Sequence, residues 1–451
     1  MFCKRRCKAS LTSWLHFMIE RYFVIISFDA LGKNDLNVLK SLPGFGKLME
    51  TASYSDQVYS VYPSLTYPCH TSISTGMYPM NHGVVSNTLL QMNRKSPDWN
   101  WERSRIKADT FYDAAMRNGL TTAALLWPVT GKSGITYNLP EVFPNRPWEN
   151  QIMVSLRNGS PKYLLELTTR FGYLLKGIHQ PWLDNFVFAS AQYTIKEKRP
   201  NVIMMHFVEL DAMRHHFGYH SKEADEALLS YDDKLFSLMK LLEDEGIMDQ
   251  TTLFVLGDHD QIPVEKAMHL NAVFKAKGLI QTTHQKITGY EAYVKSEDGS
   301  AYVYLKNPKD TLMLEKVKEI IQALKERPDF GIEEIYSKEE AIALGANRNC
   351  SFMLEAKRGF LFEDSHTSPA LMDLAETKSK DGSYGKSTHG FSPFKEDYQT
   401  VFFATGKGIK KNIQLPSMRL IDEGPTFAHL MGARLQGTDG RVLSEILENE
   451  Q

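Results

Sequence analysis

The sequence predicts an α/β protein: a doubly wound, mostly parallel sheet flanked by helices, with a smaller inserted α+β unit. Three observations support this class. Continuous apolar runs rich in β-branched residues, such as YFVIISF at 22–28, are typical of strands buried on both faces of a parallel sheet. Amphipathic helical patterns alternate with these runs, as expected when helices cover both faces. Residues 286–365 change to alternating polar and apolar segments, which indicates a separate unit.

The core elements follow in order from the same patterns. After the strand at 22–28, residues 35–52 read as a helix that is broken at Pro43 and Gly44. Further helices are expected at 108–118, 161–176, 184–198 and 222–245, and further strands at 122–126, 201–208 and 251–256.

The C-terminal part carries the inserted unit and the return to the sheet. Residues 301–307 and 351–362 predict short strands, and residues 310–326 predict a charged helix. A hydrophilic loop at 376–386 precedes a strand at 399–404 and a last helix at 422–431. We therefore expect a core of 18–285 and 366–451, an inserted cap unit of 286–365, and an N-terminal tail of 1–17, with Met18 as an alternative start.

Composition excludes several classes of protein. Of the 451 residues, 42% are hydrophobic and 24% are charged, as in soluble globular proteins, and the net charge of −2 gives no basis for a nucleic-acid scaffold. Glu20 and Arg21 interrupt the apolar N-terminal stretch, and no segment reaches membrane-spanning length, so we expect a cytoplasmic protein. The four cysteines form neither a disulfide framework nor a zinc knuckle, so a bound metal must be held by Asp and His.

The stretch from Tyr62 to Asn87, YPSLTYPCHTSISTGMYPMNHGVVSN, carries the candidate nucleophile. Thr66 stands where the extended segment 58–61 gives way to a helix-compatible run, so its hydroxyl should lie at a helix N-terminus. Free backbone N–H groups and the helix dipole favour an oxyanion there. A threonine that merely caps a surface helix would look the same in isolation, and a nucleophile would need a base or a metal nearby.

Asp and His residues follow the predicted strands and can supply that metal. Parallel strands end at one edge of a sheet, where ligands of open α/β proteins bind. The strand-end groups are Asp29, Asp211, His215, Asp258, His259 and His389. Three Asp and three His residues provide three ligands for each of two cations and leave positions open for substrate. Two such cations stabilise both the attacking and the leaving oxygen of an in-line displacement at phosphorus.

Four blocks of this sequence resemble the nucleotide pyrophosphatase/phosphodiesterase branch of the alkaline phosphatase superfamily. FDALG is similar to its first metal motif, and PSLTYPCHTSISTGMYPMNHGVVSN to its nucleophile block. ELDAMRHHFG and GDHD resemble its second and third metal motifs, and STHGF its last. The resemblance extends from about residue 18 to the C-terminus and implies an alkaline phosphatase-like core.

The resemblance implies two zinc ions, although other divalent metals would suit the same ligands. One zinc would be held by Asp29, Asp258 and His259 and would activate Thr66. The other would be held by Asp211, His215 and His389 and would stabilise the leaving oxygen. Asn87 would hydrogen-bond a phosphoryl oxygen, and Thr66 would form a phosphothreonine ester that water hydrolyses. The implied substrate is a small phosphodiester or a nucleotide.

The sequence departs from the family pattern at three places. Ala30 follows the first Asp where Gly is usual, Cys69 replaces an Asn in the nucleophile block, and Arg214 replaces a Gly before His215. Two alternatives stay open on the same metal core: a phosphonate hydrolase or phosphomonoesterase, and a relative without turnover. His206, His216 and His220 are expected to be packing or surface residues, and the oligomeric state is not specified.

Overall fold

A computed structural model describes residues 21–376 and 385–449. The predicted tail 1–17, the alternative start at Met18 and most of the loop at 376–386 lie outside these residues. In the described part of the chain, no helix has the length and apolar character needed to cross a membrane.

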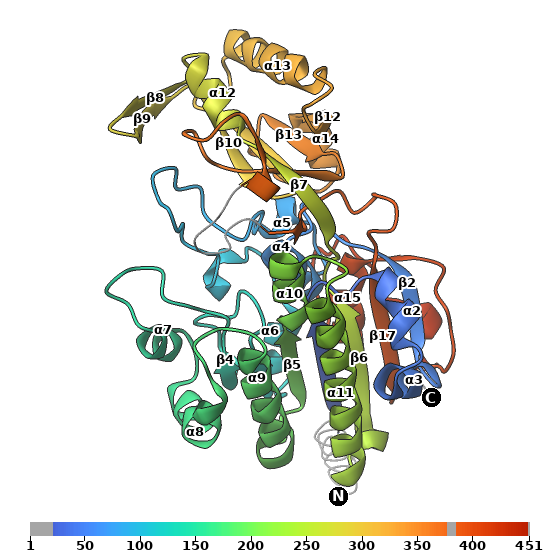
Figure 1. The fold of residues 1–451 in the computed structure, drawn as a ribbon. Helices are drawn as coiled ribbons and strands as arrows, with labels where there is room; N and C mark the ends of the chain where they lie inside the picture. The colour runs from blue at the N-terminus through green and yellow to red at the C-terminus, as the bar shows by residue number, and fades with distance from the viewer. Residues whose placement is uncertain (1–20, 377–384, 450–451) are drawn as a thin grey trace, which may run out of the picture.

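Eight strands form the main sheet, and the predicted doubly wound α/β class is confirmed (Figure 1). Five of the seven strand pairs are parallel, and only β17 runs antiparallel to both of its neighbours. In spatial order the strands are β18 (Met418–Arg419), β2 (Ser53–Tyr59), β17 (Thr400–Gly406), β6 (Thr251–Gly257), β1 (Tyr22–Phe28), β5 (Val202–Phe207), β3 (Thr122–Leu125) and β4 (Tyr137–Leu139).

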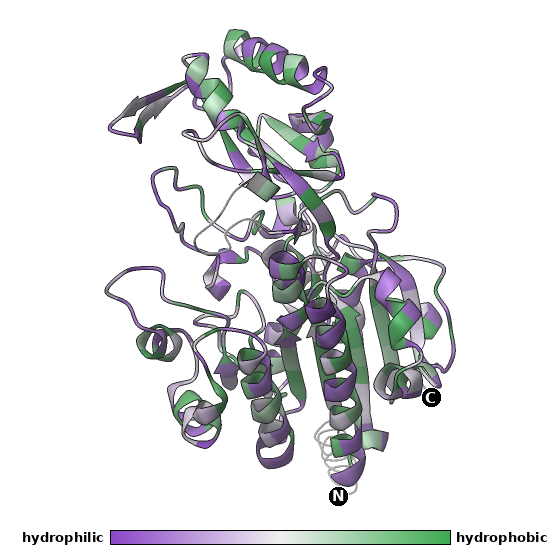
Figure 2. Ribbon diagram, in the orientation of Figure 1, coloured by the Kyte–Doolittle hydropathy of each residue, from purple (hydrophilic) through white to green (hydrophobic). Residues whose placement is uncertain are grey.

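Alternate residues of β1 enter two different hydrophobic cores, which explains its unbroken apolar sequence. Val24, Ile26 and Phe28 pack in one core, and Phe23 and Ile25 pack in the other. The first core is covered by α2 (Leu36–Leu39), α3 (Pro43–Met49), α8 (Pro161–Phe171), α9 (Trp182–Tyr193) and α11 (Lys222–Asp244). The second is covered by α4 (Thr66–Thr75), α6 (Phe111–Arg117) and α15 (Glu423–Leu430). Figure 2 shows hydrophobic strands behind α11, whose outer face is mostly hydrophilic.

Most helices lie where the sequence places them. The break predicted at Pro43 separates α2 from α3, with Pro43 as the first residue of α3. The helix predicted at 161–176 ends earlier, because α8 gives way to a 3₁₀ turn at Gly172–Leu174. The helix predicted at 184–198 continues from α9 as a π-helical turn at Thr194–Lys198.

A smaller region of three sheets stands beyond one end of the main sheet (Figure 1). Its largest sheet is antiparallel, in the order β10 (Ala292–Glu297), β11 (Ser300–Leu305), β13 (Phe352–Ala356) and β12 (Ile332–Ser337). The helix α13 (Thr311–Lys325) packs on this sheet through Val317, Ile321 and Leu324, and α14 (Lys338–Ala343) follows β12.

The strand β7 (Ile262–Met268) connects the main sheet to the smaller region. It pairs with β14 (Gly359–Phe362), β15 (Leu371–Asp373) and β16 (Ser387–Thr388), while α12 (Leu270–Ala276) and the hairpin of β8 (Ile280–Thr283) and β9 (Lys286–Tyr290) follow it. Pairing therefore joins residues on both sides of positions 285 and 366, and the predicted division into core 18–285, 366–451 and cap 286–365 stays a prediction.

Candidate metal centre and nucleophile

Thr66 is the first residue of α4, at the helix N-terminus that the sequence predicts. Leu65 before it is extended, with φ −116° and ψ 148°, so the chain turns into the helix at the threonine. The side chain is buried, and Oγ1 lies 3.3 Å from Nε2 of His259. The hydroxyl therefore faces the group of Asp and His residues rather than solvent.

Three adjacent parallel strands bring that group together. Asp29 follows β1, and Asp258 and His259 follow its neighbour β6. Asp211 and His215 lie one turn apart on α10 (Glu209–Phe217), which begins two residues after the other neighbour, β5. His389 comes from a distant part of the chain, directly after β16.

The ligand atoms of these residues form two clusters that share a carboxylate. Asp211, His215 and His389 place one donor atom each within 4.8 Å of one another, and so do Asp29, Asp211 and His259. Asp258 is not part of either cluster, although its Oδ2 lies 3.3 Å from Nε2 of His259. The His259 and His389 rings lie side by side, with centroids 4.3 Å apart.

The electrostatics of the clusters favour a bound cation. Burial raises the pKa of Asp29 well above its usual range, and repulsion from Asp258 adds to it. Burial followed by repulsion from Asp211 raises the pKa of Asp258. Burial opposes ionisation of Asp211 too, but His215 and His389 hold its pKa below the ordinary value. Carboxylates that destabilise one another in a buried place are stabilised by a divalent cation.

Unpartnered atoms support the same conclusion. Asp29 Oδ1 and Asp258 Oδ2 are buried and accept no hydrogen bond from the described residues. Both face His259 Nε2, at 3.5 and 3.3 Å. Buried polar atoms are normally satisfied, so two orphaned carboxylate oxygens beside an imidazole fit the coordination of a metal such as zinc.

Other side chains hold the candidate ligands in place, and the sequence did not single them out. His206 was expected only to pack, yet its Nε2 lies 3.2 Å from Asp29 Oδ2. His70, one turn after Thr66 on α4, bonds the Thr66 carbonyl through Nδ1 at 2.9 Å and lies 3.6 Å from Asp258 Oδ2. His216 and His220 are exposed.

Imidazole ligands need one nitrogen fixed so that the other can face a metal. Nδ1 of His215 lies 2.8 Å from the carbonyl oxygen of Ser387, which leaves Nε2 directed at Asp211. Asp211 raises the pKa of His215 to about 9 despite burial. The Ser387 hydroxyl donates to Gln261, whose amide donates to Asp211. These bonds tie two candidate ligands of one cluster into a single network.

Asn87 lies beside the nucleophile. Its Oδ1 accepts a hydrogen bond of 2.9 Å from the backbone N–H of Tyr67, the residue after Thr66. This bond directs the amide NH₂ of Asn87 away from the helix backbone. Tyr67 is buried and packs on Trp99 with ring centroids 5.2 Å apart.

The carboxyl group of Glu141, whose Oε2 is buried, also lies near the candidate site. Burial raises the pKa of Glu141 to about 8, and its Oε2 has no hydrogen-bond partner among the described residues. Glu141 belongs to none of the motifs identified in the sequence.

Arg214, which replaces the usual Gly, points away from the clusters. Its guanidinium contacts Asp35 at 2.5 Å and Asp260 at 3.2 Å, donates to the Ala30 carbonyl, and lies 3.9 Å from the centre of the Tyr219 ring. Because two buried carboxylates hold it, Arg214 does not supply a cation to the candidate site.

Comparison with solved structures defines the class of fold. Murine ectonucleotide pyrophosphatase/phosphodiesterase 5 matches with a TM-score of 0.64 and 18% identity, covering 95% of this chain and 100% of that one. The human protein of the same name matches with a TM-score of 0.65 and 19% identity over the same shares. The main sheet and its helices therefore have the alkaline phosphatase-like architecture of these structures.

Sequence comparison identifies the family. A family model described as type I phosphodiesterase / nucleotide pyrophosphatase matches residues 23–398, and the chain belongs to this family. An ectonucleotide pyrophosphatase/phosphodiesterase of Caenorhabditis elegans is 24% identical over 428 residues, which are 92% of this chain and 47% of that protein. Family member 1 of Homo sapiens is 25% identical over 243 residues, 51% of this chain and 22% of that protein. The chain thus spans about half or less of these relatives.

Asp184 holds the start of α10 in place through two hydrogen bonds. It is fully buried, and its two oxygens accept from the backbone N–H groups of Val208 and Glu209 at 3.1 and 3.0 Å. Asp184→Ala removes the acceptor of both N–H groups, one of them buried and the other partly buried, so we expect the free energy of unfolding to fall by about 2 to 4 kcal/mol in a denaturant titration. Asp184→Asn keeps an acceptor and should lose less stability.

Asp225→Ala is an exposed control on α11, and its free energy of unfolding should fall by less than about 0.5 kcal/mol. Equal stability of Asp184→Ala and wild type would contradict this role.

Proposed function

We propose that the chain is a two-metal phosphodiesterase or nucleotide pyrophosphatase that uses Thr66 as its nucleophile. The observation that carries this proposal is the Thr66 hydroxyl, buried at the start of α4 and 3.3 Å from His259 within the convergent Asp and His residues. We assign Asp29, Asp258 and His259 to one metal and Asp211, His215 and His389 to the other. Zinc ions bound there would act as Lewis acids toward the attacking and leaving oxygens.

The residues around Thr66 would each contribute to a displacement at phosphorus. Thr66 Oγ1 would lose its proton and form a bond to phosphorus while the bond to the leaving oxygen breaks. This gives a phosphothreonine ester and the leaving group, whose oxygen takes up a proton in place of the one that Thr66 loses. The Thr66 backbone N–H at the start of α4 and the amide NH₂ of Asn87 would donate to the phosphoryl oxygens, since the Tyr67 N–H is bonded to Asn87 Oδ1 and Pro68 has no N–H. Water then displaces Thr66 at phosphorus and releases a phosphomonoester.

A nucleotide or another small diester is the substrate class that we propose. One murine relative has been solved in an inactive form in complex with AMP. In this chain Trp99 and Trp101 each pack on Phe143, with ring centroids 5.1 and 5.4 Å apart, and Trp99 also packs on Tyr67 beside Thr66. Aromatic faces at this position would suit a planar group of the substrate, such as a nucleobase carried by the phosphoryl group.

Phosphonate or monoester hydrolysis on the same metal core remains the alternative. The predicted cytoplasmic location also stays a prediction, and relatives of this chain include proteins named ectonucleotide pyrophosphatases and venom phosphodiesterases.

Metal content tests the ligand assignment. The wild-type protein should bind close to two zinc equivalents by elemental analysis and should lose activity with a chelator. Asp211→Ala and Asp258→Ala should each retain about one equivalent, because each removes a ligand from a different set, and the exposed control Asp225→Ala should retain two. Asp211 belongs to both clusters of ligand atoms. If Asp211→Ala loses both zinc equivalents, Asp211 binds both metals and the assignment of three separate ligands to each metal is wrong. Wild-type protein without metal would contradict the proposal.

Replacing the nucleophile tests its role. Thr66→Ala should lose turnover by several orders of magnitude with unchanged zinc content, since the hydroxyl acts only in bond formation. Thr66→Ser keeps a hydroxyl and should recover part of the rate. A Thr66→Ala variant with more than about a tenth of wild-type kcat would exclude this role, because a tenth corresponds to only about 1.4 kcal/mol of barrier.

The substrate preference follows from the neutral surroundings of the phosphoryl group. A monoester carries an additional negative charge that favours a further cation, whereas Asn87 is neutral and Arg214 is held by Asp35 and Asp260. We expect kcat/KM for a p-nitrophenyl diester to exceed that for the matching monoester by about tenfold or more. A ratio that favours the monoester would establish the alternative activity instead.

A further inference from the structure

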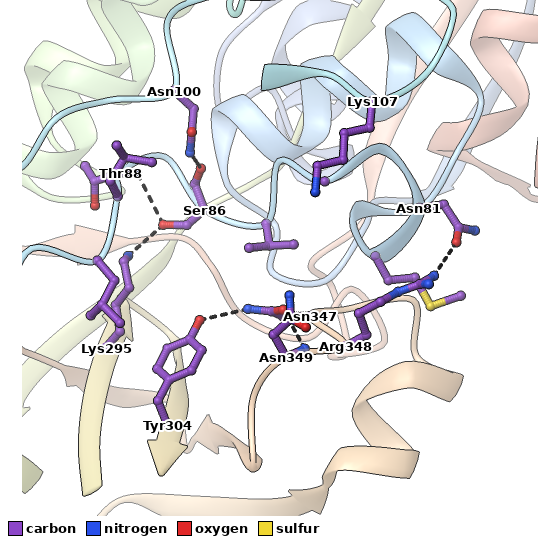
Figure 3. A pocket seen from close by; sticks show the side chains of 15 residues that line it. Asn81, Ser86, Thr88, Asn100, Lys107, Lys295, Tyr304, Asn347, Arg348 and Asn349 are labelled. Atoms are coloured by element: carbon purple, nitrogen blue, oxygen red, sulfur yellow. Dashed lines mark hydrogen bonds between the residues drawn. The ribbon is translucent and has the colours of Figure 1, made fainter. Parts of the chain in front are cut away.

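A cavity of about 410 Å³ lies between the main-sheet core and the smaller region, outside the candidate catalytic site (Figure 3). One wall comes from the chain around α5 (Pro79–His82) and from Lys107, and the other comes from β10, β11 and the loop before β13. Its fifteen lining residues include neither Thr66 nor Asn87 nor any of the six candidate metal ligands. A ligand could therefore occupy it independently of Thr66.

The charge of this cavity is positive. Its lining includes Lys107, Lys295 and Arg348 but no Asp or Glu. Lys295 is buried and balanced by Glu297 at 2.8 Å, while its ammonium also donates to Ser86 Oγ at 2.7 Å. Lys107 and Arg348 are exposed and form no ion pair with any described residue, and the Arg348 guanidinium donates only to the Asn81 amide oxygen. Two positive charges are therefore left without a counter-charge.

Neutral hydrogen-bonding groups surround these cations. Tyr304 and the buried Asn347 form a hydrogen bond of 2.8 Å across the floor, and Ser86 and three further Asn side chains also face the space. Figure 3 shows Lys107 directed from the core toward the loop that carries Asn347 and Arg348. A guanidinium and an ammonium among amides and hydroxyls are groups that recognise tetrahedral oxyanions.

We propose that this cavity is a second anion-binding site, which takes a phosphate group either as the free ion or on a small phosphomonoester. A phosphate monoester carries a charge of about −1.5 to −2 near neutral pH, which matches the two unbalanced cations better than a single carboxylate does. The volume lies within the range of about 300 to 1,000 Å³ that small-molecule sites occupy, and Met80, Val85 and Leu89 provide an apolar wall for an organic group.

Two measurements on the metal-loaded chain of 451 residues test the site. Equilibrium dialysis with labelled inorganic phosphate should show one more phosphate bound per chain in wild type than in the variant Lys107→Gln/Arg348→Gln. The affinity at this site should fall by about tenfold or more when both charged donors are removed. Lys95→Gln/Arg157→Gln removes two exposed charges that do not line the cavity, so it should bind like wild type. A melting temperature close to that of wild type would show that each variant is folded.

Crystals soaked with tungstate locate the anion, because its anomalous signal marks a tetrahedral oxyanion. We expect a peak between Lys107 and Arg348. Competition by AMP or ribose 5-phosphate that disappears in the double variant would identify a phosphomonoester site, and competition by inorganic phosphate alone would identify a free-ion site. Equal phosphate binding by wild type and the double variant, or tungstate only at the Asp and His clusters, would overturn the proposal. Neither result would bear on the role of Thr66.

Discussion

The parallel pairing of β1 with β5 and β6 is the constraint on which the candidate site depends. In this register Phe28 stands level with Phe207 on one side and with Gly257 on the other. The next residue after β1 is therefore Asp29, beside Asp258 after β6 and the start of α10 after β5. Three segments that are far apart in the sequence place their polar groups together only because the strands point the same way. A slip of one residue would turn each of these side chains to the other face.

That arrangement places like charges in a buried position, where they repel one another. Neighbouring side chains and backbone N–H groups offset this repulsion. Asp29 and Asp258 repel one another, while His206 and His70 lie against them and donor groups from Ala30 and His259 reach Asp258. Asp184 secures the helix that brings Asp211 and His215. Such supporting contacts do not perform chemistry, but they keep the oxygen atoms directed inward when no cation balances them.

The sequence predicts the parts of the fold that have a strong local pattern. Strands β1, β5 and β6 and helix α11 lie within one or two residues of their predicted bounds, because burial on two faces or on one helical stripe fixes their composition. The strand β7 was not predicted, since IPVEKAM contains a proline and two adjacent charged residues and has no continuous apolar run. The strands β4 and β18, of three and two residues, are too short to carry a period.

The same limit applies to the candidate site. Asp29, Asp258 and Thr66 could be selected because they stand at a change from strand to loop or helix. The involvement of His70, Glu141 and Gln261 depends on contacts between distant segments, which no local pattern encodes. The position of Arg214 could not be predicted either, because it depends on Asp35 and Asp260 meeting the same guanidinium.

His389 links the smaller region to the candidate site. Thr388 pairs with Ile262 at the start of β7, so the pairing of β16 with β7 positions the histidine. Its carbonyl accepts from Gly299 in the turn between β10 and β11, and the next residue, Gly390, donates to Ser64, two residues before Thr66. Gly390 has φ +82°, and a Cβ there would stand 2.0 Å from the Glu297 carbonyl oxygen, so only glycine fits. His389, the last candidate ligand, is thus held between the segment before Thr66 and the β10–β11 turn, so its position depends on contacts with both.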